Sequence, residues 1–274
     1  MTHSRPGILE LLDRHGLSPS RALGQNFVAD PNTVRRIVRF AEVTSDTTVI
    51  EIGPGLGSLT LALAETGATV VAVEIDRHLI PVLTDVLAGT AATVVHADAL
   101  EVDFRSLIGA GPATLVANLP YNVSVPLVMR ILEEFPEITS LLVMVQREVG
   151  ERLVAPPRSE AYGAVSVKVA YFAHGSVVAR VPASVFVPKP NVESVLVRLI
   201  RHEVPATAQG VAPSRLFDLI KQAFGQRRKM LRSTLKGLLD DAAFDRAGVA
   251  GTRRAEELGL DEFAALAREA TWTG

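Results

Sequence analysis

The chain has 274 residues, a formal net charge of −2 at pH 7 and no cysteine, and 48% of its residues are hydrophobic. Without cysteine it cannot form disulfides, thiolate zinc sites, iron–sulfur clusters or a cysteine nucleophile. No apolar run reaches the about 18 residues that a membrane-spanning helix requires. Because the net charge is slightly negative, any nucleic acid would have to bind a local basic patch.

The first part of the chain is expected to be helical and irregular. Residues 7–15 have the pattern of a short amphipathic helix, and residues 19–30 that of a loop. Pro31 suits the first position of a helix, where its missing N–H costs no hydrogen bond, so a second helix is predicted over residues 32–42. The N-terminus has no apolar core of a signal peptide, and with the lack of cysteine this favours a cytoplasmic protein.

The next part of the chain alternates between two hydrophobic patterns. Short apolar runs rich in β-branched residues predict strands at residues 47–52, 68–75, 92–97, 113–118 and 140–146. Segments with helical spacing lie between them at residues 58–65, 77–87 and 125–135. This alternation predicts an α/β fold whose mostly parallel sheet is covered by helices on both faces.

The remainder of the chain predicts an antiparallel sheet edge followed by a helical region. A helix is expected at residues 161–172, and strands at residues 175–186 and 192–200. A polar linker then leads to a helical pattern that continues to Trp272. We therefore predict two domains, comprising residues 1–204 and 205–274.

A glycine-rich turn suggests a cofactor site. The segment EIGPGLG, residues 51–57, leaves a predicted strand and enters a predicted helix. Glycines there let backbone N–H groups approach a ligand at the positive end of the helix. The dinucleotide fingerprint requires glycine at position 58, which is Ser58, so the spacing disfavours NAD. It suits S-adenosylmethionine (SAM), which has no pyrophosphate.

Carboxylates at successive strand ends support the same interpretation. Glu74 ends the second predicted strand, where its two oxygens can accept the hydroxyls of a ribose. Asp98 follows the third strand and can accept a hydrogen bond from an adenine amino group. One such carboxylate alone would usually be a solvated strand end. Three of them, counting Glu51, favour a cofactor site.

The residues Asn118, Leu119, Pro120 and Tyr121 suggest the reaction. The exocyclic nitrogen of adenine is a poor nucleophile because its lone pair is delocalised into the ring. Two acceptors, the Asn118 side chain and the Leu119 carbonyl, can favour a pyramidal nitrogen, and Pro120 restricts the backbone that presents the carbonyl. Tyr121 can stack on the base, so that catalysis is mostly positioning. Alone, these four residues are equally compatible with an ordinary strand-to-loop turn.

Seven segments together resemble a known family. They are LGQNF (23–27), EIGPGLG (51–57), Glu74, HADAL (96–100), NLPYN (118–122), FVPKPNVES (186–194) and FGQRRKMLRSTL (224–235). Their identity and order resemble the bacterial small-subunit ribosomal RNA adenine dimethyltransferases, the dimethyladenosine transferase A family, over nearly the whole chain. The resemblance implies a Rossmann-like SAM-dependent methyltransferase domain with a mixed, mostly parallel sheet, and a small all-helical C-terminal domain.

The resemblance also implies site residues. The cofactor site would comprise Gln25, Asn26, Val28, Glu51, Gly53, Gly55, Gly57, Glu74, Asp98, Ala99 and Asn118. The catalytic site would comprise Asn118, Leu119, Pro120, Tyr121 and Phe186. Phe186 would stack on a flipped adenine opposite Tyr121, although a core phenylalanine is the alternative.

A basic segment is the candidate RNA-binding surface. Its cations, which have no acid among them, are Lys221, Arg227, Arg228, Lys229, Arg232 and Lys236. At helical spacing Arg228, Arg232 and Lys236 would share one face and bind rRNA phosphates. A solvated charged face is the alternative. Arg147 is a further candidate, which can contact RNA phosphate or pair with Glu148.

The implied reaction is dimethylation at N6 of two adjacent adenosines in the 3′ hairpin of 16S rRNA, in the 30S subunit. We expect a monomer that binds no metal and no membrane. Two rivals remain: a resistance-type methyltransferase of 23S rRNA, and a ribosome-assembly or transcription factor that needs no turnover. A combined role in methylation and small-subunit biogenesis is compatible with the same residues.

Overall fold

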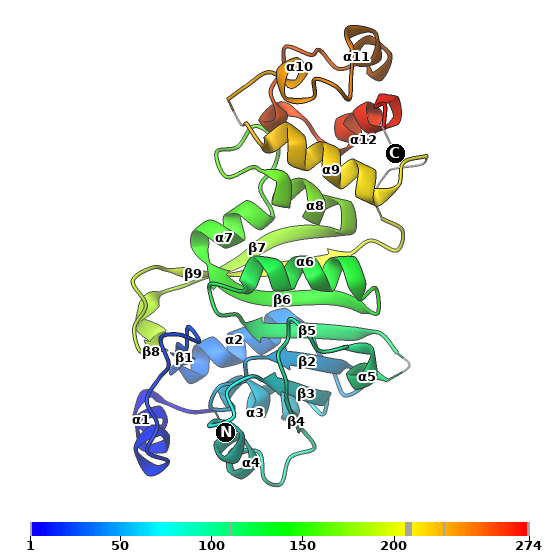
Figure 1. The fold of residues 1–274 in the computed structure, drawn as a ribbon. Helices are drawn as coiled ribbons and strands as arrows, with labels where there is room; N and C mark the ends of the chain where they lie inside the picture. The colour runs from blue at the N-terminus through cyan, green and yellow to red at the C-terminus, as the bar shows by residue number, and fades with distance from the viewer. Residues whose placement is uncertain (1, 110, 206–209, 227, 273–274) are drawn as a thin grey trace. The chain divides into compact units, whose positions relative to one another are not determined.

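The computed structural model describes residues 2–109, 111–205, 210–226 and 228–272 (Figure 1). The described chain divides into two compact units. Unit 1 consists of the residues up to Gly150 together with Ser176–Arg201, and unit 2 consists of Glu151–Gly175 together with the residues from His202 onward. Residues 151–175, which the predicted domain boundary placed with the sheet, therefore cluster with the C-terminal helices.

Unit 1 is built on a seven-stranded sheet with strand order β4-β3-β2-β5-β6-β9-β7. Its strands are β2 (Thr48–Ile52), β3 (Thr69–Glu74), β4 (Thr93–His96), β5 (Ala113–Asn118), β6 (Ile138–Gln146), β7 (Ala173–Val181) and β9 (Ser194–Arg201). Neighbours from β4 to β6 pair in parallel, and β9 pairs with β6 in antiparallel fashion. The mixed, mostly parallel sheet confirms the predicted fold class.

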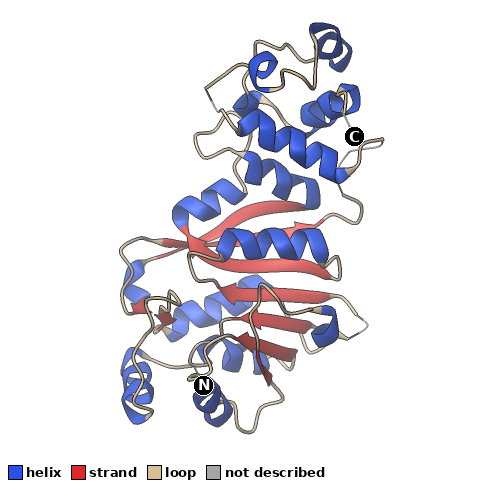
Figure 2. Cartoon of the chain, viewed as in Figure 1, coloured by secondary structure: helices blue, strands red, loops and turns tan. Residues whose placement is uncertain are grey.

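Helices cover both faces of this sheet, which explains why β2 and β3 are apolar along nearly their whole length. These helices are α2 (Pro31–Ala41), α3 (Ser58–Ala64), α4 (Ile80–Val86), α5 (Arg105–Ile108), α6 (Ser124–Glu134) and α7 (Arg147–Leu153). Figure 1 shows α6 in front of the sheet and α2 behind it, and Figure 2 shows the strands between these helices. Asp30 caps α2 by accepting from the Thr33 backbone N–H at 2.9 Å.

The N-terminal segment of unit 1 is joined to the segment before β9. After α1 (Arg5–Arg14), the two-residue strand β1 (Phe27–Val28) pairs in antiparallel fashion with β8 (Phe186–Val187). The sequence predicted one strand over residues 175–186, but β7 ends at Val181 and a short 3-10 turn, η1 (Ala183–Val185), separates it from β8. The β1–β8 pair brings the LGQNF and FVPKPNVES segments side by side.

Unit 2 is helical, and none of the helices in the described part of the chain has the length and apolar composition of a membrane span. Its elements are α8 (Ala164–Phe172), α9 (Pro213–Phe224), α10 (Leu231–Thr234), α11 (Asp241–Ala247), the 3-10 turn η2 (Ala255–Glu257) and α12 (Leu260–Glu269). Aromatic edges hold α8 to α9, with the Tyr171 and Phe217 ring centroids 5.2 Å apart. This packing explains why α8 clusters with the C-terminal helices.

The expectation that Arg228, Arg232 and Lys236 share one face of a helix is wrong. Helix α9 ends at Phe224, and α10 begins only at Leu231. The backbone N–H groups of Leu231 and Arg232 donate to the carbonyls of Arg253 and Gly251, at 2.8 and 2.9 Å, instead of continuing a helix. The i, i+4, i+8 spacing therefore does not place the basic residues on one helical face.

Candidate active site

A cavity of about 250 Å³ lies at the carboxyl ends of β2, β3, β4 and β5. This edge of an open parallel sheet is where ligands bind in α/β folds. Every residue predicted to bind the cofactor lines the cavity except Gly57, and four of the five predicted catalytic residues also line it. The residues predicted from sequence segments that are far apart along the chain therefore line one and the same cavity.

The glycine turn after β2 approaches the cavity closely. Gly55 has φ +60, and a Cβ there would lie 2.9 Å from Cδ1 of Phe27, so a side chain is excluded by both strain and space. Gly57 has φ +81 and faces away from the cavity, since a Cβ there would lie 3.1 Å from Val86 on α4. Gly57 therefore permits the packing of α3 against α4 rather than contact with a ligand.

Glu74, at the end of β3, is held in place by the glycine turn. Its Oε2 accepts from the Gly55 N–H at 3.2 Å, and its Oε1 accepts from the Asp76 N–H at 2.9 Å. Burial raises the pKa of the Glu74 carboxyl. Each oxygen retains a second lone pair, so Glu74 can still accept the hydroxyls of a ribose.

Glu51 is the most deeply buried carboxylate that lines the cavity, with 1% of its surface exposed. Burial raises its pKa from 4.5 to about 8, and the nearby charge of Glu74 acts in the same direction. Among the described residues, Glu51 Oε2 has no hydrogen-bond partner. A buried acceptor left unpaired is costly in the absence of a ligand.

Asp98 begins a tight turn after β4. Its Oδ1 accepts from the Leu100 N–H at 2.8 Å, and its carbonyl accepts from the N–H groups of Glu101 and Val102 at 3.0 and 2.9 Å. These bonds fix the orientation of the carboxylate and leave Oδ2 for a ligand. Ala99, the next residue, also lines the cavity.

Asn118, the last residue of β5, is oriented by the LGQNF segment. Its Nδ2 donates to the Asn26 carbonyl at 2.9 Å, and because a carbonyl can only accept, Oδ1 is the oxygen left available. Gly24 packs against Pro120, where a Cβ would lie 3.4 Å from the proline Cβ. The two segments therefore form one wall of the cavity.

Gln25 connects this wall of the cavity to the residues that follow β3 through hydrogen bonds. Its Oε1 accepts from the Ser20 N–H at 2.7 Å, and its Nε2 donates to Asp76 Oδ2 at 2.8 Å. Gln25 also lines the cavity, and its amide keeps a second N–H and a second lone pair. Gln25 therefore shapes the site, and its role in binding a cofactor stays a prediction.

Tyr121 is attached at two points. The Ser124 hydroxyl donates to its carbonyl at 3.2 Å, and its phenol oxygen lies 3.4 Å from Oγ of Ser194 at the start of β9. Leu119 is buried, and its N–H donates to the carbonyl of Met144 on β6 at 3.0 Å. These contacts hold the Asn118–Tyr121 turn at the sheet edge.

The structure does not place Phe186 where it could stack on an adenine, as predicted. The ring is 1% exposed and packs in the unit 1 core with Val34, Ile37 and Leu196, and Phe186 is not among the residues that line the cavity. Stacking on a base requires an open ring face, which this packing covers. The core alternative describes the observed placement.

The predicted RNA-binding residues lie in both units. In unit 2, Lys221, Arg228, Lys229, Arg232 and Lys236 are all exposed, and Arg227 lies outside the described residues. In unit 1, Arg147 donates to Glu193 Oε2 at 3.4 Å rather than standing alone. The sequence missed Ile75, which directly follows Glu74, lines the cavity and is 48% exposed. An apolar residue beside a strand-end carboxylate is the signal that could have found it.

Comparisons with known proteins identify the family of this chain. The family model described as ribosomal RNA adenine dimethylase matches residues 17–271. A protein of Leifsonia xyli subsp. xyli, named ribosomal RNA small subunit methyltransferase A, is 49% identical, and the match covers 95% of each chain. A protein of the same name from Bifidobacterium longum strain DJO10A is 47% identical over 92% of this chain and 88% of its own.

Solved structures share the fold. The 23S rRNA methyltransferase ErmE matches with a TM-score of 0.70 and 27% identity over 89% of this chain and 98% of its own. A dimethyladenosine transferase from Plasmodium falciparum matches with a TM-score of 0.75 and 23% identity over 86% of this chain and 94% of its own, which supports the fold alone. The match of the family model over residues 17–271 and the relatives at 47–49% identity show that the chain belongs to the ribosomal RNA adenine dimethylase family.

Proposed function

We propose that this chain transfers methyl groups from SAM to N6 of two adjacent adenosines in the 3′-terminal hairpin of 16S rRNA, within the 30S subunit. The observation that carries the proposal is the hydrogen bond from Asn118 Nδ2 to the Asn26 carbonyl. It leaves Oδ1 as an acceptor in the cavity that Glu74 and Asp98 also line. One cavity thus holds groups suited to a cofactor and a group suited to an amino nitrogen.

The residues present fit SAM. Glu74 offers acceptors for ribose hydroxyls, and Asp98 Oδ2 offers one for an adenine amino group. The backbone at Gly53 and Gly55 approaches the cavity without side chains, and Asn26 lines its wall. When bound, SAM supplies an electrophilic methyl group on a sulfonium.

The reacting turn favours attack by a positioned amino group. Asn118 Oδ1 and the Leu119 carbonyl accept from the N–H bonds of the target and return electron density to its nitrogen, while Tyr121 stacks on the base. The methylated nitrogen forms as a cation and then loses a proton to solvent. Only one N–H then remains, so the second transfer uses one acceptor. Positioning is therefore more important than a rigid two-bond clamp.

The relatives' name supports the small subunit as the substrate, since it specifies methylation of small-subunit RNA. Phosphate contacts would come from Lys221, Arg228, Lys229, Arg232 and Lys236, with Arg227 and Arg147 as further candidates. We propose that the protein acts as a cytoplasmic monomer that needs no metal. Methylation would form part of 30S biogenesis.

The substrate can be tested by offering two RNAs. The purified chain is incubated with radiolabelled SAM and either 30S subunits from a strain that lacks this methylation or protein-free 23S RNA. We expect N6,N6-dimethyladenosine at adjacent positions of the 16S 3′ hairpin. Label on 23S RNA alone would contradict the proposal and favour the activity named for ErmE. Label on neither RNA would favour a non-enzymatic assembly factor.

A further inference from the structure

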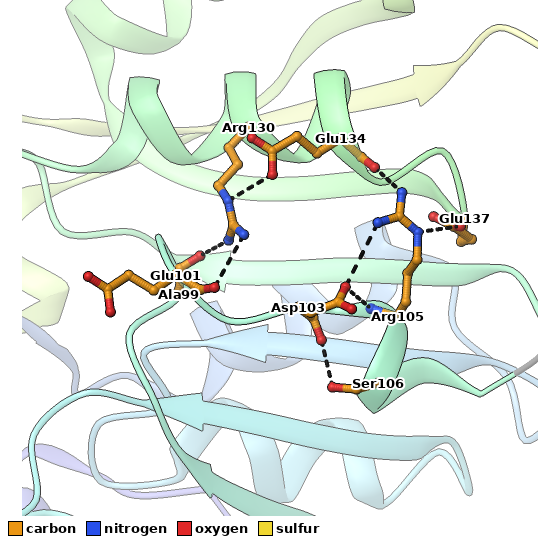
Figure 3. A network of polar contacts seen from close by, with 8 residues as sticks. All are labelled: Ala99, Glu101, Asp103, Arg105, Ser106, Arg130, Glu134 and Glu137. Carbon is orange, nitrogen blue, oxygen red and sulfur yellow. Dashed lines mark hydrogen bonds and ion pairs between the residues drawn. The ribbon is translucent and has the colours of Figure 1, made fainter.

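Arg130, on α6, donates hydrogen bonds to the loop that follows β4. Its Nη1 donates to the Ala99 carbonyl at 2.8 Å, and its Nη2 donates to the Glu101 carbonyl at 3.5 Å (Figure 3). Ala99 and its neighbour Asp98 line the cavity, whereas Arg130 does not. Arg130 therefore lies outside the cavity and contacts the Asp98–Glu101 loop on the side that faces away from the cavity.

The guanidinium of Arg130 is itself held in one orientation. Its Nε donates to Glu134 Oε2 at 3.2 Å, one helical turn away. Its Cζ lies 5.8 Å from the ring centroid of Phe104 and 5.0 Å from that of Phe135, and both rings are buried. The side chain is 17% exposed, so the pairing is partly shielded from solvent. Little entropy remains to be lost when it binds the loop.

The hydrogen bonds from Arg130 to the loop also affect the position of Asp98, because of the conformation of the loop. The Asp98 carboxylate accepts from the Leu100 N–H, and the Asp98 carbonyl accepts from the N–H groups of Glu101 and Val102. These bonds make the turn a closed unit, so moving the carbonyl of Ala99 moves the carboxylate of Asp98 with it. Arg130 supplies the contact that attaches this unit to α6.

Helix α6 also begins at the reacting turn. Its first residue, Ser124, donates through its hydroxyl to the Tyr121 carbonyl at 3.2 Å. Val123 and Leu127, at the same end of the helix, line the cavity. One rigid helix of 11 residues therefore contacts the Asn118–Tyr121 turn at one end and the Asp98–Glu101 loop through Arg130.

We propose that Arg130 is a positioning residue for methyl transfer, which holds the Asp98–Glu101 loop at a fixed distance from the Asn118–Tyr121 turn. It acts on the adenosine end of the cofactor through the loop and touches neither cofactor nor base. This inference rests on the proposed function, because it requires the cavity to bind SAM. It adds a residue that no strand-end or glycine motif indicates.

Arg105 provides a matched control in the same network. It donates to Glu137 Oε1 at 2.9 Å and to the Glu134 carbonyl, and its Cζ lies 5.0 Å from the Phe135 ring centroid (Figure 3). None of these partners lines the cavity. Arg105 also pairs with Asp103 Oδ1 at 3.9 Å, beyond the Asp98–Glu101 segment. Replacing either arginine removes a guanidinium from one cluster, but of the two only Arg130 donates to the carbonyls of that segment.

The test compares Arg130→Met with Arg105→Met in the full chain. Methionine keeps an apolar stem and removes the donors. Calorimetry measures the Kd of S-adenosylhomocysteine and of 5′-methylthioadenosine, which lacks the amino-acid part. We expect Arg130→Met to weaken both ligands by about tenfold, because either ligand would then have to order the loop that Arg130 holds in place in the wild type, and Arg105→Met to change them by less than about twofold. In 30S assays Arg130→Met should raise KM for SAM and leave KM for 30S unchanged.

Equal Kd values in the two variants, at a similar loss of Tm, would overturn the inference. So would a loss seen with S-adenosylhomocysteine but not with 5′-methylthioadenosine, because the loop serves only the adenosine end. If Arg130→Met does not fold, Arg130→Lys keeps the charge and should still weaken both ligands, by about threefold, since it lacks the planar fork. A wild-type chain that binds neither ligand would overturn the proposed function, and this inference with it, whereas normal wild-type binding isolates the role of Arg130.

Discussion

Replacing Glu51 with glutamine should stabilise the ligand-free protein at neutral pH. Burial raises the pKa of Glu51 from 4.5 to about 8, so the folded protein keeps a proton that the unfolded chain releases above pH 4.5. The wild type therefore loses stability as the pH rises from 4.5 to 8, at about 1.4 kcal/mol per pH unit. Glutamine has the same shape and does not titrate.

The expected difference follows from this slope. At pH 4.5 the unfolding free energies of wild type and Glu51→Gln should be nearly equal, because Glu51 is then largely protonated in the folded state. At pH 7 the variant should be more stable by about 3 kcal/mol. Urea unfolding at half-unit pH steps measures the difference. Glu74 contributes nearly equally to both proteins, because folded Glu51 is uncharged below about pH 8, as glutamine is. Parallel stability curves for the two proteins between pH 5 and 8 would refute the reasoning.

Two further substitutions test the packing of each unit. Gly55→Ala should weaken S-adenosylhomocysteine binding by more than about tenfold and lower Tm, because its Cβ would lie 2.9 Å from Phe27 at a positive φ; calorimetry and thermal unfolding measure both effects. An unchanged Kd would contradict the close approach. Tyr162→Phe should destabilise unit 2 by about 1–3 kcal/mol in urea unfolding, since the phenol donates to the Leu258 carbonyl at 2.7 Å and the buried acceptor would lose its partner. A change below about 0.3 kcal/mol would show that the bond contributes little.

The parts of the fold that could be predicted are those whose structure is determined by a short local stretch of sequence. Strands β2 and β5 were predicted to within a residue, because strands buried on both faces need continuous apolar runs. The glycine turn and the strand-end carboxylates were located for a similar reason, since the edge of a parallel sheet collects its ligand-binding groups at fixed points along the chain.

The failures depend on contacts between distant segments. The 224–235 segment has helical spacing, but the N–H groups of Leu231 and Arg232 bond to carbonyls of residues 253 and 251, which no local pattern encodes. Phe186 sits in a short strand paired with residues 27–28, and that pairing turns its ring into the core. No sequence motif singled out Arg130, because its contact with the loop after β4 depends on how α6 packs.

The central claim is that Asn118 acts on the reacting amino group from a cavity that binds the cofactor independently. Single-turnover methyl transfer to unmethylated 30S subunits by Asn118→Ala, with the Kd of S-adenosylhomocysteine measured on the same preparation, tests it most directly. The account predicts a rate at least about 100-fold lower than wild type, with a Kd within about fivefold. A near-normal rate, or a rate loss fully explained by lost cofactor binding, would contradict it.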